Sequence, residues 1–396
     1  MTNSNTTQLS LLMFIILGAI GALTPLAIDM YLPAMPIIAK ELGVNPGAVQ
    51  ITLTMYTAGF ALGQLLHGPL SDSFGRKPVL IVGILLFAIG SVVCATTSDI
   101  ESLTYVRAAQ GFAGASAAVV IQALVRDMFE KEDFARTMSF VTLVIMVAPL
   151  IAPMLGGHLA EWFGWRSIFW VLTLVSGFVI AAVVWKIPET LAPENRQKLH
   201  IRTTLHNYVR LFLNPVAAGL MFAGAFSFAG MFAFLTAGSF VYIDIYGVET
   251  AQFGYLFGLN VVGLIIMTTI NGRIVKRVSS KWMLSLAIMT QLVAGIGLFF
   301  GWLMDIGLWG IVPFTMLYIS MMSTVGSNSM AILLSAYPSM AGTASSLAGT
   351  LRFGVGSIVG IVVAMLPSDS AWPMILLMTM CAVSSAAFYW FLGRKA

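Results

Sequence analysis

Three charged residues interrupt long apolar stretches of the sequence, namely Asp29, Arg107 and Arg352. A charge inside a membrane span costs about 2.5–3.5 kcal/mol on insertion scales, so such residues are usually kept for function. Burial favours the protonated form of a carboxyl group, whereas a nearby cation favours the carboxylate. A carboxyl group that alternates between these influences would act as a proton switch. We therefore predict that Asp29 and Arg107, both expected in the outer halves of their helices, form a proton-coupling pair.

Other interpretations of this pair stay open at the level of the sequence. Asp29 and Arg107 could form a static ion pair that only holds two helices together. Asp29 could instead lie at the outer headgroup level, because Pro33 follows it closely. Arg107 is expected about one turn into its span, so its side chain could extend to the membrane surface.

Arg352 is expected deeper in the membrane, about ten residues into the predicted span 341–366. At 1.5 Å per residue this depth is roughly 15 Å, which is close to the bilayer centre. An arginine there must find water, an acid or backbone carbonyls. Its five donors suit the carbonyl, sulfonyl and hydroxyl oxygens of polar, uncharged molecules. We predict that Arg352 contacts the substrate. The alternative is that Arg352 only holds its helix to a neighbouring helix through hydrogen bonds to backbone carbonyls.

The predicted span 215–242 is rich in phenylalanine. Phe228 and Phe232 lie one turn apart and therefore share a face of the helix. They could form an apolar wall for a substrate, or they could contact lipid. We assign both to the candidate substrate-binding set.

Composition places these residues in a membrane protein. Hydrophobic residues make up 59% of the 396 positions and charged residues only 9%, against about 25% charged residues in soluble domains. A spanning helix needs about 20 apolar residues. Twelve stretches meet or approach this length: 9–32, 48–70, 78–97, 103–125, 137–157, 166–186, 215–242, 252–271, 282–303, 307–335, 341–366 and 371–392. The sequence therefore predicts an all-α membrane protein with twelve transmembrane helices.

The lysines and arginines predict how the chain is oriented. With the N-terminus inside, the inner loops and the C-terminal tail hold sixteen of these residues, and the outer loops hold only Lys40 and Arg166. Short loops rich in lysine and arginine face the cytoplasm. We expect both termini in the cytoplasm. We also expect the net charge of +4 to interact with anionic lipid headgroups and not with nucleic acid.

The longest polar stretch divides the predicted spans into two sets of six. We predict an N-terminal six-helix bundle at 1–187, a cytoplasmic linker at 188–214 and a C-terminal six-helix bundle at 215–396. Equal halves are typical of transporters built by internal duplication, in which one half rocks against the other around a central site.

The segment GPLSDSFGRKP at 68–78 joins the second and third spans. Its glycines, Gly68 and Gly75, would permit a tight turn, and Asp72 could pair with Arg76 to hold the inner side shut. The segment resembles the signature loop of the major facilitator superfamily, G-x-L-x-D-x-x-G-R-K, at every fixed position, Lys77 included. We expect a cytoplasmic gate here. The resemblance implies the major facilitator fold.

Two further segments are similar to motifs of this superfamily. The run RAAQG at 107–111 resembles its R-x-x-Q-G motif, and we place Gln110 in the candidate substrate-binding set. The run APMLGG at 152–157 resembles the antiporter motif G-P-x-x-G-G, with alanine in place of the first glycine. Two prolines four residues apart, Pro149 and Pro153, kink a helix, and the pair Gly156 and Gly157 allows close packing. This motif favours exchange over one-way transport.

A narrower resemblance extends across nearly the whole chain. The run around Asp29, the pair Arg126 and Asp127, and AGTASSLAGTLRFG at 341–354 are together similar to the Bcr/CflA drug-resistance family. This resemblance implies drug:proton antiport in the bacterial inner membrane, with bicyclomycin, sulfonamides or phenicols as substrates. It also implies that helices 1, 4, 7 and 10 line a central cavity, and that Asp127 joins Asp72 and Arg76 in an inner charge relay. We expect a monomer whose partners are a small drug molecule, protons and membrane lipid.

Several other functions are not supported by the residues. The sequence has no P-loop, no CxxC pair, no metal-ligand spacing, and no visible cluster of nucleophile, base and orienting residue. We therefore expect no enzyme activity, no cofactor and no metal. The alternative function is export of an endogenous metabolite or amino acid. A non-transporting sensor or scaffold would predict a large soluble domain in addition to the spans.

Overall fold

The computed structural model describes residues 11–129, 131–196, 201–367 and 369–395. Within these ranges the chain is helical and holds no β-strand. The long helices are α1 (Leu11–Asp29), α3 (Pro46–Phe74), α4 (Arg76–Thr96), α5 (Ile100–Met128), α6 (Lys131–Phe163), α7 (Arg166–Lys186), α9 (Pro215–Ser239), α10 (Thr250–Val278), α11 (Ser280–Leu303), α12 (Leu308–Ala336), α13 (Ala341–Met365) and α14 (Trp372–Phe391). The shorter elements are α2 (Met35–Leu42), α8 (Ile201–Leu213), a π-helical turn (Phe240–Ile245) and 3-10 turns at Leu32–Ala34, Pro193–Asn195, Pro338–Met340 and Gly393–Lys395.

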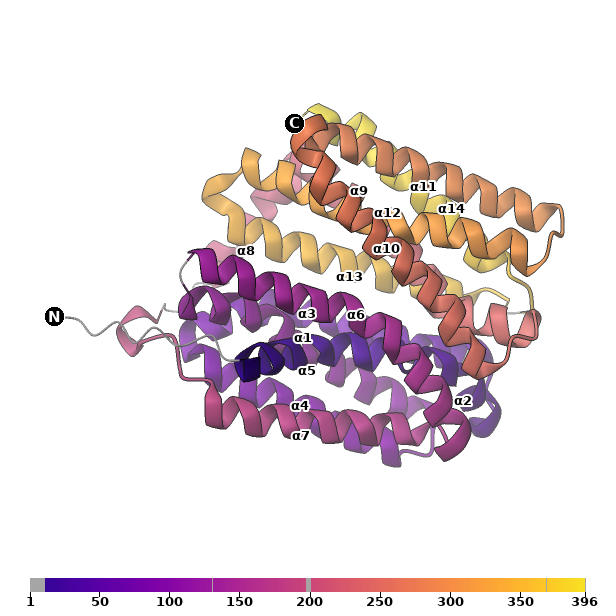
Figure 1. Cartoon of the computed structure of the whole chain (residues 1–396), viewed down its shortest axis with the longest axis horizontal. Coiled ribbons are helices and arrows are strands. Elements are labelled where there is room, and N and C mark those ends of the chain that lie inside the picture. The colour runs from indigo at the N-terminus through magenta and orange to yellow at the C-terminus, as the bar shows by residue number, and fades with distance from the viewer. Residues whose placement is uncertain (1–10, 130, 197–200, 368, 396) are drawn as a thin grey trace.

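The long helices form two groups, as Figure 1 shows, with α1 and α3–α7 in one and α9–α14 in the other. Each group repeats the same packing. In the first, α1 packs on α6, α3 on α5, and α4 on α5 and α7; in the second, α9 packs on α13, α10 on α12, and α11 on α12 and α14. This repetition confirms the prediction of two six-helix bundles and fits an internal duplication.

The polar stretch between the bundles was expected to be a simple linker, and this expectation was incomplete. The helix α8 occupies Ile201–Leu213 within the predicted linker 188–214 and packs against α9 and α13.

Eleven helices in the described part of the chain are long and apolar enough to cross a membrane. The remaining long helix is α3, which has 29 residues but a more polar composition. Its buried polar residues include Gln50, Thr52, Thr54 and Thr57. This composition suits its position, because α3 packs between α5 and α13 and faces protein on both sides. The twelve predicted spans therefore all correspond to long helices.

The first span is longer than predicted and is interrupted near its centre. The prediction ended at residue 32, whereas the apolar segment continues to Leu42 and covers 31 residues. The helix α1 ends at Asp29, and a 3-10 turn precedes α2. Pro33 and Pro36 explain the interruption, because proline lacks the N–H that a continuous helix needs. Asp29 consequently lies well inside the span.

Polar caps set the starts of several helices outside the apolar core. Asn45 accepts a hydrogen bond from the Ala48 amide at 2.8 Å and begins α3. Asp99 accepts one from the Ser102 amide at 2.7 Å and begins α5, and this bond lowers the pKa of the Asp99 carboxyl. Asn214 caps α9 in the same way.

The two bundles meet at one end of the molecule, named here the Lys40 end. Lys40 of α2 pairs with Asp244 at 3.2 Å, and Glu161 of α6 accepts a hydrogen bond from the Ala251 amide of α10 at 3.0 Å. Between this end and the centre, α3 packs along α13. The opposite end, where α3 meets α4, is named the Arg76 end. The structure is thus held closed at the Lys40 end.

Candidate functional site

A cavity of about 530 Å³ lies between the two bundles. Eight helices line it: α1, α3, α5 and α6 from the first bundle, and α9, α10, α12 and α13 from the second. The expected lining by the first, fourth, seventh and tenth long helices (α1, α5, α9 and α12) was therefore incomplete. The additional four helices are those that form the contact between the bundles, so any rocking motion would reshape the cavity.

Asp29 ends α1 at the wall of this cavity. Only 6% of its surface is exposed, and no described residue makes a hydrogen bond or ion pair with its carboxyl group. The headgroup-level alternative is therefore wrong, because Asp29 is buried near the middle of its span. A carboxyl group that faces a cavity without a fixed partner is free to bind a proton or a guest molecule.

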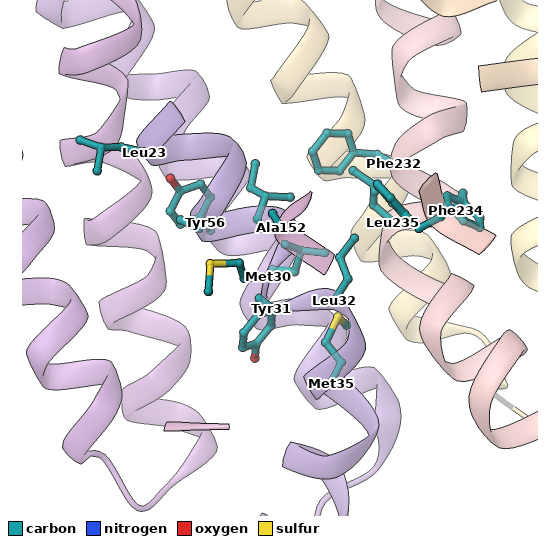
Figure 2. Packing of buried hydrophobic residues seen from close by; sticks show 14 of the residues in the cluster. Leu23, Met30, Tyr31, Leu32, Met35, Tyr56, Ala152, Phe232, Phe234 and Leu235 are labelled. Atoms are coloured by element: carbon teal, nitrogen blue, oxygen red, sulfur yellow. The ribbon is translucent and has the colours of Figure 1, made fainter. Parts of the chain in front are cut away.

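Arg107 of α5 is fully buried inside the first bundle, with 0% of its surface exposed. Its guanidinium carbon lies 4.7 Å from the ring centre of Tyr31, 4.4 Å from that of Tyr56 and 5.7 Å from that of Phe169. Figure 2 shows Tyr31, in the turn that follows α1, and Tyr56 of α3. Aromatic faces attract a cation. Arg107 therefore does not extend to the membrane surface.

The polar contacts of Arg107 do not include Asp29. Its guanidinium donates to the Gln110 side chain at 2.8 Å and to the Ala27 carbonyl at 3.2 Å. The static ion pair between Arg107 and Asp29 is therefore absent among the described side chains. The Ala27 bond nevertheless ties Arg107 to α1 two residues before Asp29, so a shift of Arg107 would move the segment that carries the acid.

The structure places Gln110 away from the cavity. It is fully buried, and its amide donates to the Ser91 hydroxyl of α4 at 2.8 Å while its carbonyl oxygen accepts from Arg107. The physical reason is its direction on α5, which points it toward α4 and not between the bundles. Gln110 thus positions Arg107 and does not contact a molecule in the cavity.

Four phenylalanines form an apolar wall on one side of the cavity. Phe228 and Phe232 of α9 both line it, and their ring centres are 5.3 Å apart. Phe353 of α13 packs edge-to-face against Phe228, with ring centres 5.0 Å apart, and at a tilt against Phe60 of α3, with ring centres 4.5 Å apart. The lipid-contact alternative for Phe228 and Phe232 is therefore wrong. Sequence reasoning missed Phe60 and Phe353, although Phe353 directly follows Arg352.

Arg352 lines the cavity opposite the first bundle. One of its terminal nitrogens donates to the Gly326 carbonyl of α12 at 3.0 Å. No other hydrogen bond joins its guanidinium to a described residue. The hydrogen bond to α12 agrees with the structural interpretation. Arg352 lines the central cavity and also a small pocket beside Gly224 and Ser329, so a substrate contact stays a prediction.

The signature segment forms a charged cluster at the Arg76 end. Arg76 is 5% exposed; it pairs with Asp72 at 2.5 Å and with Asp127 of α5 at 3.2 Å, and it donates to the Ser71 hydroxyl at 2.7 Å. The predicted relay of Asp72, Arg76 and Asp127 is thus brought together. All its members belong to the first bundle, so in this structure the cluster joins α3, α4 and α5 and does not bridge the two bundles.

The turn between α3 and α4 is a single residue, Gly75, with a φ of +104°. Gly68 was expected to help form a turn, but it lies inside the continuous helix α3, and an added Cβ there would only touch Val119 at 3.8 Å. Glu189, which sequence reasoning did not assign, accepts hydrogen bonds from the Arg76 amide at 3.0 Å and the Lys77 amide at 3.3 Å. A carboxylate at a helix start is stabilised by the free amides.

The second bundle carries the same turn without its acid. Seven residues separate Gly68 from Gly75, and the same spacing separates Gly272 from Ser279. Ser279 ends α10 with a φ of +82°, a region that favours glycine. Lys276 stands at the position of Asp72, so the acid–arginine cluster has no equivalent in this turn.

The antiporter-like motif lies where α6 crosses α1 and α10. Pro149 and Pro153 lie inside α6, and Pro149 lines the cavity. A Cβ on Gly156 would come within 2.1 Å of the carbonyl oxygen of Met30, in the turn after α1, and one on Gly157 would come within 3.0 Å of the Thr250 carbonyl oxygen of α10. Gly156 therefore permits close contact within the first bundle, and Gly157 permits close contact with the second bundle.

The chain matches the Major Facilitator Superfamily over residues 17–361. It is 42% identical, over 98% of both chains, to a bicyclomycin resistance protein homolog of Haemophilus influenzae. The chain belongs to the major facilitator superfamily and to the drug-resistance group of this relative. It is also 30% identical to a chloramphenicol resistance protein of Pseudomonas aeruginosa, covering 91% of this chain and 86% of that protein.

The fold agrees with this membership. The structure of a D-xylose–proton symporter superposes with a TM-score of 0.75, covering 95% of this chain and 97% of the symporter at 16% identity. At that identity the likeness concerns the fold alone. This major facilitator protein is therefore a multi-pass membrane transporter, and its family and fold are not those of enzymes.

Proposed function

We propose that this major facilitator protein exports small drug-like molecules across the bacterial inner membrane in exchange for protons. The observation that carries the proposal is the central cavity, which combines an aromatic wall with a single acid, Asp29. Relatives named for bicyclomycin and chloramphenicol resistance support drug export, with bicyclomycin, sulfonamides or phenicols as the substrate types. A protonated Asp29 would carry its proton inward in the step that follows release of the drug.

The closed Lys40 end indicates which step the structure represents. Because most lysines and arginines of the loops lie at the opposite side, we place the Arg76 end and both termini in the cytoplasm. The cavity residues lie on the cytoplasmic side of the Lys40 and Glu161 contacts. This arrangement supports a state that receives the drug from the cytoplasm. The halves 1–187 and 215–396 would then rock about the cavity, with 188–214 as their connection.

The Arg76 cluster would act as the cytoplasmic gate in the other half of this cycle. It makes α3, α4 and α5 one rigid unit at the Arg76 end, which can close against the second bundle as a body. The glycines Gly68 and Gly75 and the half-buried Lys77 complete the segment, and Lys77 donates to the Val184 carbonyl at 2.9 Å.

An Asp72→Asn substitution should slow transport without unfolding the bundle. It removes one of two acids that hold Arg76, and a bias of about 1 kcal/mol would change the ratio of the two states about fivefold. Cysteines introduced at the cytoplasmic mouth should react faster with a thiol reagent, and export should slow severalfold. Asp133→Asn, at an exposed acid of α6, is the matched control. Unchanged labelling together with normal export would refute this gate.

A drug-susceptibility panel tests the function itself. Cells that express the chain should tolerate higher concentrations of chloramphenicol, bicyclomycin or a sulfonamide than cells that lack it. A panel in which expression changes no susceptibility, while the protein is found in the membrane, would refute drug export.

A further inference from the structure

The charged groups of the cavity are divided between the two bundles. Among the described residues that line it, Asp29 is the only acid and comes from α1, whereas Arg352 is the only base and comes from α13. No ion pair joins them. Asp29 has no partner, and Arg352 has one carbonyl partner. Each charge is therefore available to a molecule that occupies the space between them.

Two side-chain amides that line the cavity add to this pattern. The Gln64 side-chain oxygen of α3 and the Asn260 side-chain nitrogen of α10 are buried and have no hydrogen-bond partner in the described chain. Only 3% of the Asn260 surface is exposed. Both residues line the cavity, but their two unpaired atoms are covered by neighbouring atoms, so a polar guest would reach them only after a local movement. Each bundle again supplies one group.

We infer that the preferred guest is a dipolar aromatic molecule that bridges the two bundles. A donor group of the guest, such as an ammonium or hydroxyl group, faces Asp29. A carboxylate faces the donors of Arg352 and binds them more tightly than a neutral carbonyl or sulfonyl oxygen does, and the aromatic body lies on the wall formed by Phe228 and Phe353. This inference rests on the proposed export function and specifies the substrate class of the same cavity.

The same arrangement rejects molecules that carry only a positive charge. Arg352 remains charged and cannot be neutralised by a guest that has no anionic group, so a lone cation meets repulsion on one side. The donor of a bridging guest also occupies the position of the proton on Asp29. Binding of the guest and of the proton is then mutually exclusive, which is what an exchange cycle requires.

Norfloxacin and two of its derivatives test the inference with one aromatic body. Norfloxacin carries an ammonium and a carboxylate, its ethyl ester carries only the ammonium, and its N-acetyl derivative carries only the carboxylate. We expect the full chain in lipid nanodiscs, studied by calorimetry, to bind norfloxacin at least about tenfold more tightly than either derivative, a difference of about 1.4 kcal/mol.

Variants of Arg352 test whether this residue causes the preference for norfloxacin. Arg352→Gln should reduce the preference for norfloxacin over its ester to less than about threefold. Arg352→Lys keeps the charge and should retain the preference, and Arg277→Gln removes an exposed charge of α10 as the matched control. Melting temperatures of all variants show whether each protein is folded.

Three results would overturn the inference: the ester binds wild type as tightly as norfloxacin, norfloxacin does not bind at all, or the preference persists in folded Arg352→Gln. Export of chloramphenicol, measured beside the binding, separates this failure from that of the proposed function. If chloramphenicol is still exported, only the inference of a dipolar guest is wrong. If no compound of the susceptibility panel is exported, the proposed function falls as well.

Discussion

An Asp29→Asn variant is expected to insert normally and to lose export against a concentration gradient. Asparagine cannot take up or release a proton, so the step that couples proton entry to drug exit disappears. Moving one charge through 100 mV releases about 2.3 kcal/mol, which supports a gradient of about fifty-fold for a neutral drug exchanged with one proton. The measurement is accumulation of chloramphenicol in everted membrane vesicles, where wild type should concentrate the drug and the variant should only equilibrate it.

The control for this experiment removes an acid elsewhere. Asp133→Asn changes an exposed acid at the start of α6 and should leave the drug gradient unchanged. If the Asp29→Asn vesicles still concentrate drug well above equilibrium, Asp29 is not the coupling acid.

The second large effect is expected from Gly156→Val. The added Cβ would lie 2.1 Å from the Met30 carbonyl oxygen, and this neighbour is backbone, which cannot turn aside as a side chain can. α6 would have to move away from α1 next to Asp29. Overpacking of this kind typically costs about 1–3 kcal/mol. We expect a lower melting temperature and at least about a tenfold loss of export, since about 1.4 kcal/mol of bias already shifts a two-state ratio tenfold.

Gly177→Val provides the matched control, because a Cβ on Gly177 of α7 would meet no atom within 4 Å. That variant should melt and export as wild type does. Wild-type export by Gly156→Val would show that close approach of α6 to α1 is not needed. Equal damage from Gly177→Val would show that the effect is a general cost of valine in these helices.

The sequence predicted the long helices well because hydropathy and length determine them. It did not predict the interruption after Asp29, since the hydropathy of 30–42 continues smoothly through the prolines. The consequence is large: the interruption lengthens the span, and Asp29 lies well inside it. The Arg76 cluster was predictable because its members follow a strict spacing in one segment.

Pairing within the site was harder to predict from the sequence. Asp29 and Arg107 have opposite charges and compatible depth, which suggested direct contact. The aromatic rings of Tyr31 and Tyr56 attract the cation instead, and tyrosines on other helices cannot be assigned to it from spacing. The direction of the Gln110 side chain could not be predicted from the sequence either, because it depends on where α4 packs. Glu189 had a usable signal, an acid directly after a helix that ends near the signature segment.

Proton movement in proteoliposomes tests the central claim, drug:proton exchange through Asp29, most directly. Purified protein is reconstituted with a trapped pH-sensitive dye, and chloramphenicol is added on one side without any imposed gradient. The account predicts that drug entry drives protons out, so the lumen becomes more alkaline in wild type and stays unchanged with Asp29→Asn. Drug entry without a pH change in wild type, or an unchanged pH response in Asp29→Asn, would contradict the account.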